Sequence, residues 1–222
     1  MIKAIYFIKR KPGMDVEAFQ KYWLNTHAGI VSKLPELRKY VQCHTLLSGY
    51  RKGQPIYDGV AELWFDDTDA MRRIADLPQS KAAVADDYNF IDMPMEFILT
   101  REHVQKDGAT NPSMVRLVEF VSRKTGMDVE AFQKYWRTIH GPLAAKIPTM
   151  RRYVQSHNLL SAYRAGRHPM CDGVAEVWFD STDAMRASEK TPEYAATRAD
   201  EPNFIDATKL KFIITREHTI VG

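Results

Sequence analysis

The chain contains an internal repeat that covers nearly its whole length. The sequence GMDVEAFQKYW occurs at Gly13–Trp23 and again, without a change, at Gly126–Trp136. The correspondence continues at the same offset of 113 residues, so that Tyr40-Val41-Gln42 returns as Tyr153-Val154-Gln155. The sequence TREH closes both copies. A match of this length predicts two copies of one structural unit.

The repeat also sets the expected domain boundaries. The chain has 222 residues, which is enough for two domains of about a hundred residues each. We place the first domain at residues 1–103 and the second at 114–222. Residues 104–113 between them are polar and contain Gly and Asn-Pro, which is typical of a linker.

Each copy is predicted to fold in the order βαββαβ. In the first copy we expect strands at IKAIYFIK, RKYVQCHTLLS, DGVAELWFD and EFILTREH, with helices after the first and third strands. Asp15 is the expected N-cap of the first helix, which carries Val16, Phe19, Trp23 and His27 on one apolar stripe. In the second copy Gly141-Pro142 is expected to end or kink the equivalent helix.

This order of elements is the ferredoxin-like unit, an α+β fold with helices on one face of an antiparallel sheet. The other face of each sheet also carries apolar residues and needs to be covered. We therefore expect the two repeats to pack sheet to sheet as an intramolecular dimeric α/β barrel. The sequence leaves open whether two chains form a homodimer.

Composition and charge exclude several classes of protein. The chain is 45% hydrophobic and 27% charged, with a net charge of +3 and no block of Lys or Arg, so we expect no nucleic-acid partner. No stretch approaches 18 apolar residues, so no membrane span is expected. Cys43 and Cys171 lack the spacing of a zinc site or a disulfide framework, which favours a reducing compartment and a cytoplasmic location.

The residues resemble a known family. The sequence FQKYW at Phe132–Trp136, followed by His140 and Gly141-Pro142-Leu143, looks like the EthD family of dimeric α/β-barrel proteins, as does DGVAExWFD. The resemblance covers nearly the whole chain and implies a tandem EthD protein. The wider superfamily is known for small-molecule chemistry without cofactors and for some cofactor-free or haem-linked oxygenation. The first copy departs from the pattern, because His27 is followed by Ala28-Gly29-Ile30.

The helix-end histidines are the first candidates for chemistry. His27 and His140 lie on the apolar stripe, so each ring should point toward the sheet. Each could be a buried histidine that bonds a backbone carbonyl. We favour general acid–base residues, because the protein can place a histidine pKa near neutrality. His103 and His218, after the last strands, are expected to be surface or capping residues.

Polar side chains are expected to gather on one face of the second strand. Side chains alternate along a strand, and the residues that share this face are Tyr40, Gln42 and His44 in the first copy and Tyr153, Gln155 and His157 in the second. Val41 and Cys43 suit the helix-covered core, so we expect the polar set to face the barrel interior. There it would either bind a polar substrate group or hold the two sheets together.

Carboxylates on other strands are further candidates. Glu62 and Glu176 are expected to face the interior too, where they could exchange protons, orient a histidine or form an ion pair with an arginine. Tyr6 of the first copy is replaced by Glu119 in the second, on a strand that is otherwise apolar. A carboxylate there is costly unless it is paired or used. If only one half is active, we therefore expect it to be the second, with the first pocket degenerate or a binding element.

These residues predict a cofactor-independent lyase or isomerase that acts on a hydrophobic aromatic or polyketide-like molecule. The reaction would be a dehydration, a decarboxylation or a ring isomerisation. Catalytic candidates are His140, Glu119, His157, Tyr153, Glu176, His27 and His44. Substrate-binding candidates are Tyr6, Tyr40, Gln42, Glu62, Trp64, Gln155, Tyr163 and Trp178.

Two other functions remain open from the sequence: a non-catalytic binder of a small molecule and a cofactor-free monooxygenase. No HExxH or CxxC motif and no phosphate-binding loop occurs, so we expect no cofactor and no metal site. Ligands on separate strands could still meet to hold zinc or iron.

Overall fold

The computed structural model describes residues 1–222, which form two compact units. Unit 1 contains Met1–Leu99 together with Glu217–Gly222, and unit 2 contains Thr100–Arg216. The units therefore do not coincide with the two repeats, because the last strand of each repeat runs into the other unit. No helix is both long and apolar enough to cross a membrane.

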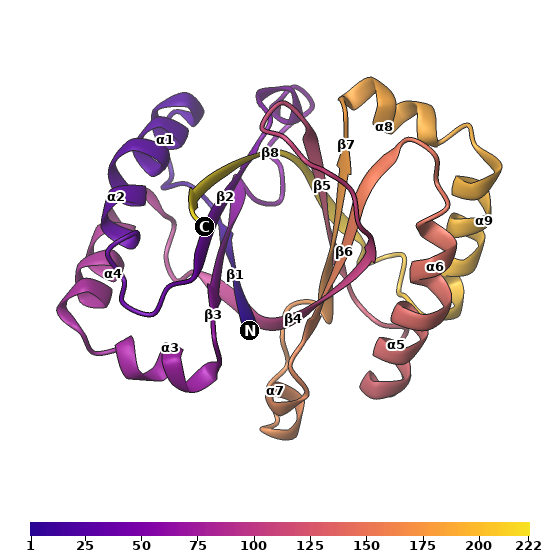
Figure 1. Ribbon diagram of the computed structural model, residues 1–222. Helices are drawn as coiled ribbons and strands as arrows, with labels where there is room; N and C mark the ends of the chain where they lie inside the picture. Colours follow the sequence, from indigo (N-terminus) through magenta and orange to yellow (C-terminus); the bar gives the residue numbers. More distant parts are fainter. The chain divides into compact units, whose positions relative to one another are not determined.

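In each unit the helices lie against one face of an antiparallel sheet (Figure 1). The elements of the first repeat are β1 (Ile2–Ile8), α1 (Val16–Tyr22), α2 (Ala28–Val31), β2 (Lys39–Thr45), β3 (Gly59–Phe65), α3 (Thr68–Ile74), α4 (Pro78–Phe90) and β4 (Glu96–Lys106). Those of the second repeat are β5 (Val115–Val121), α5 (Val129–Tyr135), α6 (Gly141–Ala144), β6 (Met150–Asn158), α7 (Leu160–Arg164), β7 (Gly173–Phe179), α8 (Thr182–Ser188), α9 (Pro192–Asp200) and β8 (Lys211–Val221).

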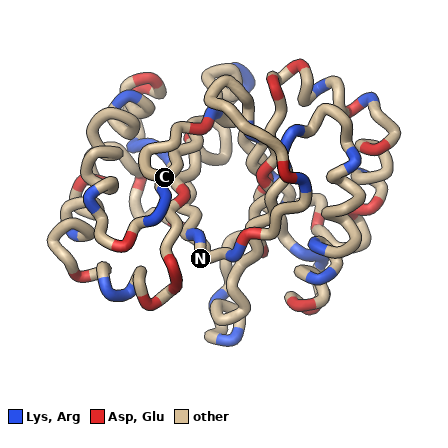
Figure 2. Tube along the Cα trace, in the orientation of Figure 1, with Lys and Arg blue, Asp and Glu red and all other residues tan.

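The strand order confirms the predicted fold class. β3 pairs with β1 and β2, and β7 pairs with β5 and β6. β5 also pairs with β8, and β6 with the second half of β4. The full order, β1-β3-β2-β8-β5-β7-β6-β4, closes on itself as in a barrel. Two βαββαβ repeats with this cyclic order form the tandem ferredoxin-like α/β barrel expected from the repeat. Charges of both signs are interspersed along the chain (Figure 2).

The first helix of each repeat begins as predicted. The side chains of Asp15 and Asp128 accept backbone N–H groups in the first turns of α1 and α5. Both helices then widen into a π-helical segment, at Trp23–His27 and Trp136–His140. Gly141-Pro142 does not end the helix, because Pro142 falls in the first turn of α6, where a missing N–H costs little.

Side chains on the second strand face the opposite way from our prediction. Gln42 donates a hydrogen bond from Nε2 to the carbonyl of Trp23, and the His44 ring stacks on the Trp23 indole, so both lie under the helices. Glu62 instead pairs with Lys3 on the other face of the sheet. Alternation determines which residues share a face, but it does not say which face the helices cover. The polar side chains of this strand can be buried under the helices because Trp23 provides a hydrogen-bond acceptor for Gln42 and a stacking surface for His44.

Three elements differ from the sequence-based boundaries. Helices α4 and α9 lie between the predicted second helix and the last strand of each repeat, and the sequence analysis missed both. Strand β4 extends to Lys106, so the predicted linker at 104–113 begins inside a strand. In that extension Val104 is opposite Val154 of β6.

Candidate active site

In each unit a cavity lies between the sheet and the helices. Cavity 1, in unit 1, has a volume of about 280 Å³ and is lined by Tyr6, His27, Tyr40, Ser80, Ala83, Val84, Asp87 and apolar side chains that include Ile8, Trp23 and Leu63. Cavity 2, in unit 2, has a volume of about 380 Å³ and is lined by Glu119, His140, Tyr153, Tyr194, Thr197, Arg198, Glu201 and apolar side chains that include Leu117, Val177 and Phe212. Both volumes suit a small molecule.

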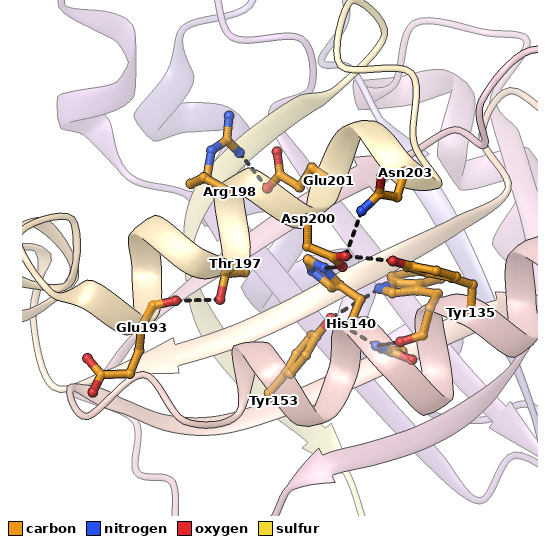
Figure 3. Close-up of polar contacts among 11 residues, drawn as sticks. Tyr135, His140, Tyr153, Glu193, Thr197, Arg198, Asp200, Glu201 and Asn203 are labelled. Carbon is orange, nitrogen blue, oxygen red and sulfur yellow. Dashed lines mark hydrogen bonds and ion pairs between the residues drawn. The ribbon is translucent and has the colours of Figure 1, made fainter.

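A hydrogen-bonded group at cavity 2 orients His140 (Figure 3). The Nδ1 atom of His140 lies 2.9 Å from Oδ2 of Asp200. The hydroxyl of Tyr135 and the amide of Asn203 both donate to the other oxygen, Oδ1, at 2.6 and 3.0 Å. Both carboxylate oxygens of Asp200 thus help to hold His140, Tyr135 and Asn203 in place.

The π-helical turn makes this arrangement possible. Tyr135 and His140 are five residues apart, a spacing that places side chains on different faces of an α-helix. In the wider turn the N–H of Gly141 bonds the carbonyl of Trp136, five residues back, so residues at this spacing come to one side. Both side chains can therefore reach the same carboxylate on the helix that follows.

Surrounding groups determine the protonation of this pair. Burial raises the pKa of Asp200, but hydrogen bonds from Tyr135, Asn203 and His140 outweigh it and keep the pKa below its usual value. Burial lowers the pKa of His140 more than Asp200 raises it. At neutral pH the imidazole is therefore neutral, and its Nδ1–H donates to an ionised Asp200. The Nε2 atom is left as a hydrogen-bond acceptor.

Glu119 is the acidic residue that lines the sheet side of cavity 2. It lies in the middle of β5, opposite Ala175 on one neighbouring strand and Phe212 on the other. Burial, followed by the negative charge of Glu201, raises the pKa of Glu119 from 4.5 to about 7, and Arg198 opposes the shift. Arg198 donates to Glu201 at 2.7 Å. Glu119 can thus either take up or release a proton near neutral pH.

Tyr153 offers a hydrogen-bond donor to the same cavity. Its hydroxyl oxygen accepts hydrogen bonds from Nε1 of Trp136 at 3.1 Å and from Nε2 of Gln155 at 3.0 Å. With both acceptor positions used, the hydroxyl hydrogen is the group left to donate to a ligand. Burial raises the pKa of Tyr153, so the phenol remains protonated at neutral pH.

His157 and Gln155 are placed outside the lining of cavity 2. The His157 ring stacks on Trp136, with 4.5 Å between ring centroids, and Nε2 lies 3.0 Å from the side-chain oxygen of Gln155. Burial is the largest cause that lowers the pKa of His157 to about 3, so the ring is neutral. Their arrangement is that of a buried network which joins the sheet to the helix, whereas the network that the sequence left open was one between the two sheets.

The same network occurs in the first repeat, where His44 bonds Gln42 and stacks on Trp23. Neither His44 nor Gln42 lines cavity 1. His103 and His218 are half-buried rather than at the surface, because their rings pack against His157 and His44.

Other predicted site residues also lie away from the cavities. Glu62 and Glu176 are buried and form ion pairs with Lys3 and Arg116, at 3.2 and 3.1 Å. Trp64 and Trp178 lie against these cations, and the hydroxyl of Tyr163 donates to Asp172. None of these residues lines either cavity. The chain contains no cluster of three or more His, Cys, Asp or Glu side chains arranged to hold a metal ion.

The sequence analysis missed the acidic residues of α4 and α9. Asp86 binds His27 at 2.8 Å, as Asp200 binds His140, and Asp87 lies at the position equivalent to Glu201. The repeat contained a signal for them, since ADDYNFID at 85–92 corresponds to ADEPNFID at 199–206. Because we did not predict a helix there, the sequence analysis could not place these carboxylates next to the histidines.

The cyclic strand order and the cavity in each half define a tandem α/β-barrel protein. The EthD domain matches the chain twice, over residues 11–94 and 124–208, and the chain therefore belongs to the EthD family. This confirms the resemblance seen in the sequence. No curated protein matches the chain.

Several solved structures are similar to this chain. An anthrone oxidase-like protein has a TM-score of 0.67 at 10% identity, covering 99% of this chain and 92% of that one. A Fusobacterium nucleatum protein, provisionally named a monooxygenase, has a TM-score of 0.64 at 9% identity, covering 98% and 93%. An EthD-family protein from Bacillus halodurans is 26% identical over 46% of this chain and 99% of its own, with a TM-score of 0.38. At these identities the first two similarities concern the fold.

Proposed function

We propose that cavity 2 is the active site of an enzyme that transfers protons on a small, largely apolar, ring-containing molecule. The observation that carries the proposal is Glu119, a carboxyl with a pKa near 7 in a cavity that also presents His140 and a phenol. The similar folds named for an oxidase-like protein and a monooxygenase support an enzyme in general. The more specific class, a lyase or isomerase, rests on the residues of the cavity.

The proposed roles follow from the protonation states. The ionised fraction of Glu119 removes a proton from a carbon next to a carbonyl group of the substrate. The negative charge that develops on the carbonyl oxygen accepts a hydrogen bond from the hydroxyl of Tyr153. His140, held by Asp200, accepts a substrate hydroxyl at Nε2 and so orients the ring.

The fate of the resulting enolate decides the reaction. If Glu119 returns the same proton to a different carbon, the product is an isomer. If a hydroxide leaves from the neighbouring carbon and takes the proton from Glu119, the products are water and an unsaturated ring. In both cases Glu119 begins and ends in the same protonation state, so neither reaction needs a cofactor.

A second function shares the first step. In this reaction the enolate carbon bonds to dioxygen and reduces it, and the proton held by Glu119 completes a hydroperoxide. Loss of water from the hydroperoxide then leaves a carbonyl group on the ring, so that one oxygen atom enters the product and the other leaves as water. Two proteins of similar fold, one oxidase-like and one provisionally named a monooxygenase, support this second function. An experiment without dioxygen distinguishes the two functions. Isomerisation and dehydration proceed equally well under anaerobic conditions, whereas the oxidation stops.

The test uses purified full-length protein and a panel of phenolic, aromatic-acid and polyketide-like compounds in D2O. Exchange of a substrate C–H for deuterium reports proton removal whatever the final product, and mass spectrometry reports loss of water or gain of oxygen. We expect exchange in the wild type and at least a hundredfold slower exchange in Glu119→Gln. In His140→Ala we expect the exchange to be lost, because the substrate is no longer oriented.

Tyr6→Phe is the matched control, because Tyr6 occupies the equivalent position at cavity 1. Its exchange rate should remain within about twofold of the wild type. Compounds that bind without exchange or change of mass, in every variant, would instead identify a non-catalytic binding protein.

A further inference from the structure

The two cavities differ in charge although their backbones are repeats of one another. At the four positions where cavity 2 has Tyr194, Thr197, Arg198 and Glu201, cavity 1 has Ser80, Ala83, Val84 and Asp87. Tyr6 also takes the place of Glu119. The lining of cavity 1 therefore contains no Lys or Arg, and it has one carboxyl, Asp87, where cavity 2 has three, Glu119, Glu189 and Glu201.

Asp87 is the polar group around which cavity 1 is built. The residue is 7% exposed, and its Oδ1 lies 3.4 Å from Nε2 of His27. Nδ1 of His27 is already directed at Asp86, so Nε2 is an acceptor. Burial and the charge of Asp86 raise the pKa of Asp87 to about 7. Near neutral pH the protonated carboxyl donates to His27, and its second oxygen remains available as an acceptor.

Tyr40 provides the complementary donor. Its hydroxyl oxygen accepts a hydrogen bond from Gln42 at 2.8 Å, so its own hydrogen can be donated to a ligand in the cavity. The rest of the wall is formed by aliphatic and aromatic side chains such as Leu63, Phe65 and Val31. A cavity of about 150 Å³ with apolar walls accommodates benzene, so about 280 Å³ accommodates a substituted ring.

We propose that cavity 1 is a second ligand site, which binds an uncharged hydroxylated aromatic molecule with its hydroxyl between Asp87 and Tyr40. The ligand hydroxyl donates to the free oxygen of Asp87 and accepts from the phenol of Tyr40. An anion is disfavoured because the lining contains no Lys or Arg to offset its charge, and the carboxylate of Asp86 lies behind His27 and Asp87. A cation is disfavoured because its desolvation in an apolar cavity would have a single partner to offset it.

Val84 decides this specificity. At the equivalent position in unit 2, Arg198 lies three residues before Glu201 and donates to it. Val84 precedes Asp87 by the same three residues on α4, and it is 53% exposed. Replacing Val84 by Arg would create the same ion pair with Asp87, and the carboxyl would no longer be available to a neutral ligand. Because Val84 is half-exposed, this replacement should leave the fold intact.

The test is a titration of the full-length protein with p-cresol, followed by 15N NMR and calorimetry at pH 7. We expect shifts of the Trp23 indole N–H and the Ala83 amide, which report cavity 1, and at least tenfold weaker binding in Val84→Arg. Glu119→Gln changes only cavity 2 and should leave these shifts unchanged.

Charged analogues complete the test. 4-Methylbenzoate and 4-methylbenzylamine have the same ring and should bind cavity 1 at least tenfold more weakly than p-cresol. The proposal is overturned if p-cresol shifts no resonance of cavity 1, if Val84→Arg leaves its affinity unchanged, or if either charged analogue binds more tightly. None of these outcomes depends on catalysis at cavity 2, so this proposal and the proposed function fail separately.

Discussion

Two carboxyl groups of unit 2 are held in different protonation states by their surroundings. Asp200 accepts three hydrogen bonds, from His140, Tyr135 and Asn203, and stays ionised. Glu119 accepts none from a protein donor and lies near a second carboxylate, so its pKa rises to about 7. A pair of carboxyls separated in this way is typical of sites where one orients and the other exchanges protons.

The raised pKa of Glu119 predicts a pH-dependent stability. Between the unfolded value of 4.5 and the folded value of about 7, the native state binds more protons than the unfolded state. The free energy of unfolding therefore falls as pH rises through this window, and above it the loss is complete. Glu119→Gln removes the titration. We expect the stability of the wild type relative to this variant to drop by on the order of 3 kcal/mol between pH 4.5 and pH 8.

Urea denaturation of both proteins across that range measures the difference. Tyr6→Phe is the control, because Tyr6 does not ionise in this range. A difference between wild type and Glu119→Gln that stays constant with pH would show that the carboxyl of Glu119 is not buried in the native state.

The sequence predicted single residues with mixed success, for a physical reason. Replacement of Tyr6 by Glu119 identified a half-buried acid that lines a cavity, because a charge in an apolar strand is costly wherever the strand lies. Tyr40 and Tyr153 also line the cavities, but on the face opposite to the one predicted. The role of Asp200 could not be predicted, because it depends on helix α9, which brings Asp200 next to His140.

At the scale of elements, a tryptophan joins each π-helical segment to the sheet. Trp136 is 1% exposed, and a Cβ atom added at Gly173 on β7 would lie 2.7 Å from its ring and 2.6 Å from the carbonyl of Ser156. The strand can approach the helix this closely because position 173 has no side chain. The position of His140, at the end of the same segment, depends on this contact.

Gly173→Ala is therefore expected to destabilise the protein by about 1–3 kcal/mol, because the new methyl group overpacks a rigid contact. Gly29→Ala is the matched control: Gly29 lies in α2 with no atom within 4 Å of an added Cβ, so alanine should be neutral or slightly stabilising. Thermal melts followed by circular dichroism measure both. Equal melting temperatures for the two variants would contradict the close packing of β7 on Trp136.

Helices α4 and α9 show what the sequence could not supply at this scale. α4 begins at Pro78 and contains both buried and exposed polar residues, so it lacks the regular apolar stripe that identified α1. Of its buried polar residues, Asp86 binds His27 and Asp87 lines cavity 1. A helix that lines a polar site loses the periodicity by which helices are recognised.

At the scale of the whole molecule, each repeat completes the sheet of the other unit. Glu217–Gly222, the end of the second repeat, belongs to unit 1, where β8 is the neighbour of β2 and His218 packs on His44. Thr100–Lys106 of the first repeat pairs with β6 in unit 2. The repeat in the sequence correctly predicted two βαββαβ copies and a cyclic order, but it does not show where one compact unit ends.

Deleting residues 217–222 should therefore weaken unit 1, although these residues belong to the second repeat. β2 would lose its neighbour on one side, and the stack of His44 on Trp23 would lose its cover. We expect amide hydrogen exchange in Lys39–Thr45 to accelerate at least tenfold, while exchange in the paired part of β5 and β7 stays unchanged. Uniform acceleration in both units, or none, would contradict this assignment of the last strand.

The exchange of last strands also has a consequence for how the chain can be divided. A cut between Lys106 and Ser113, where no strand or helix lies, would yield two fragments that each carry a strand belonging to the partner's sheet. Each fragment alone would expose unpaired strand edges and tend to aggregate. Together the two fragments should complement one another, because each supplies the last strand of the other's sheet.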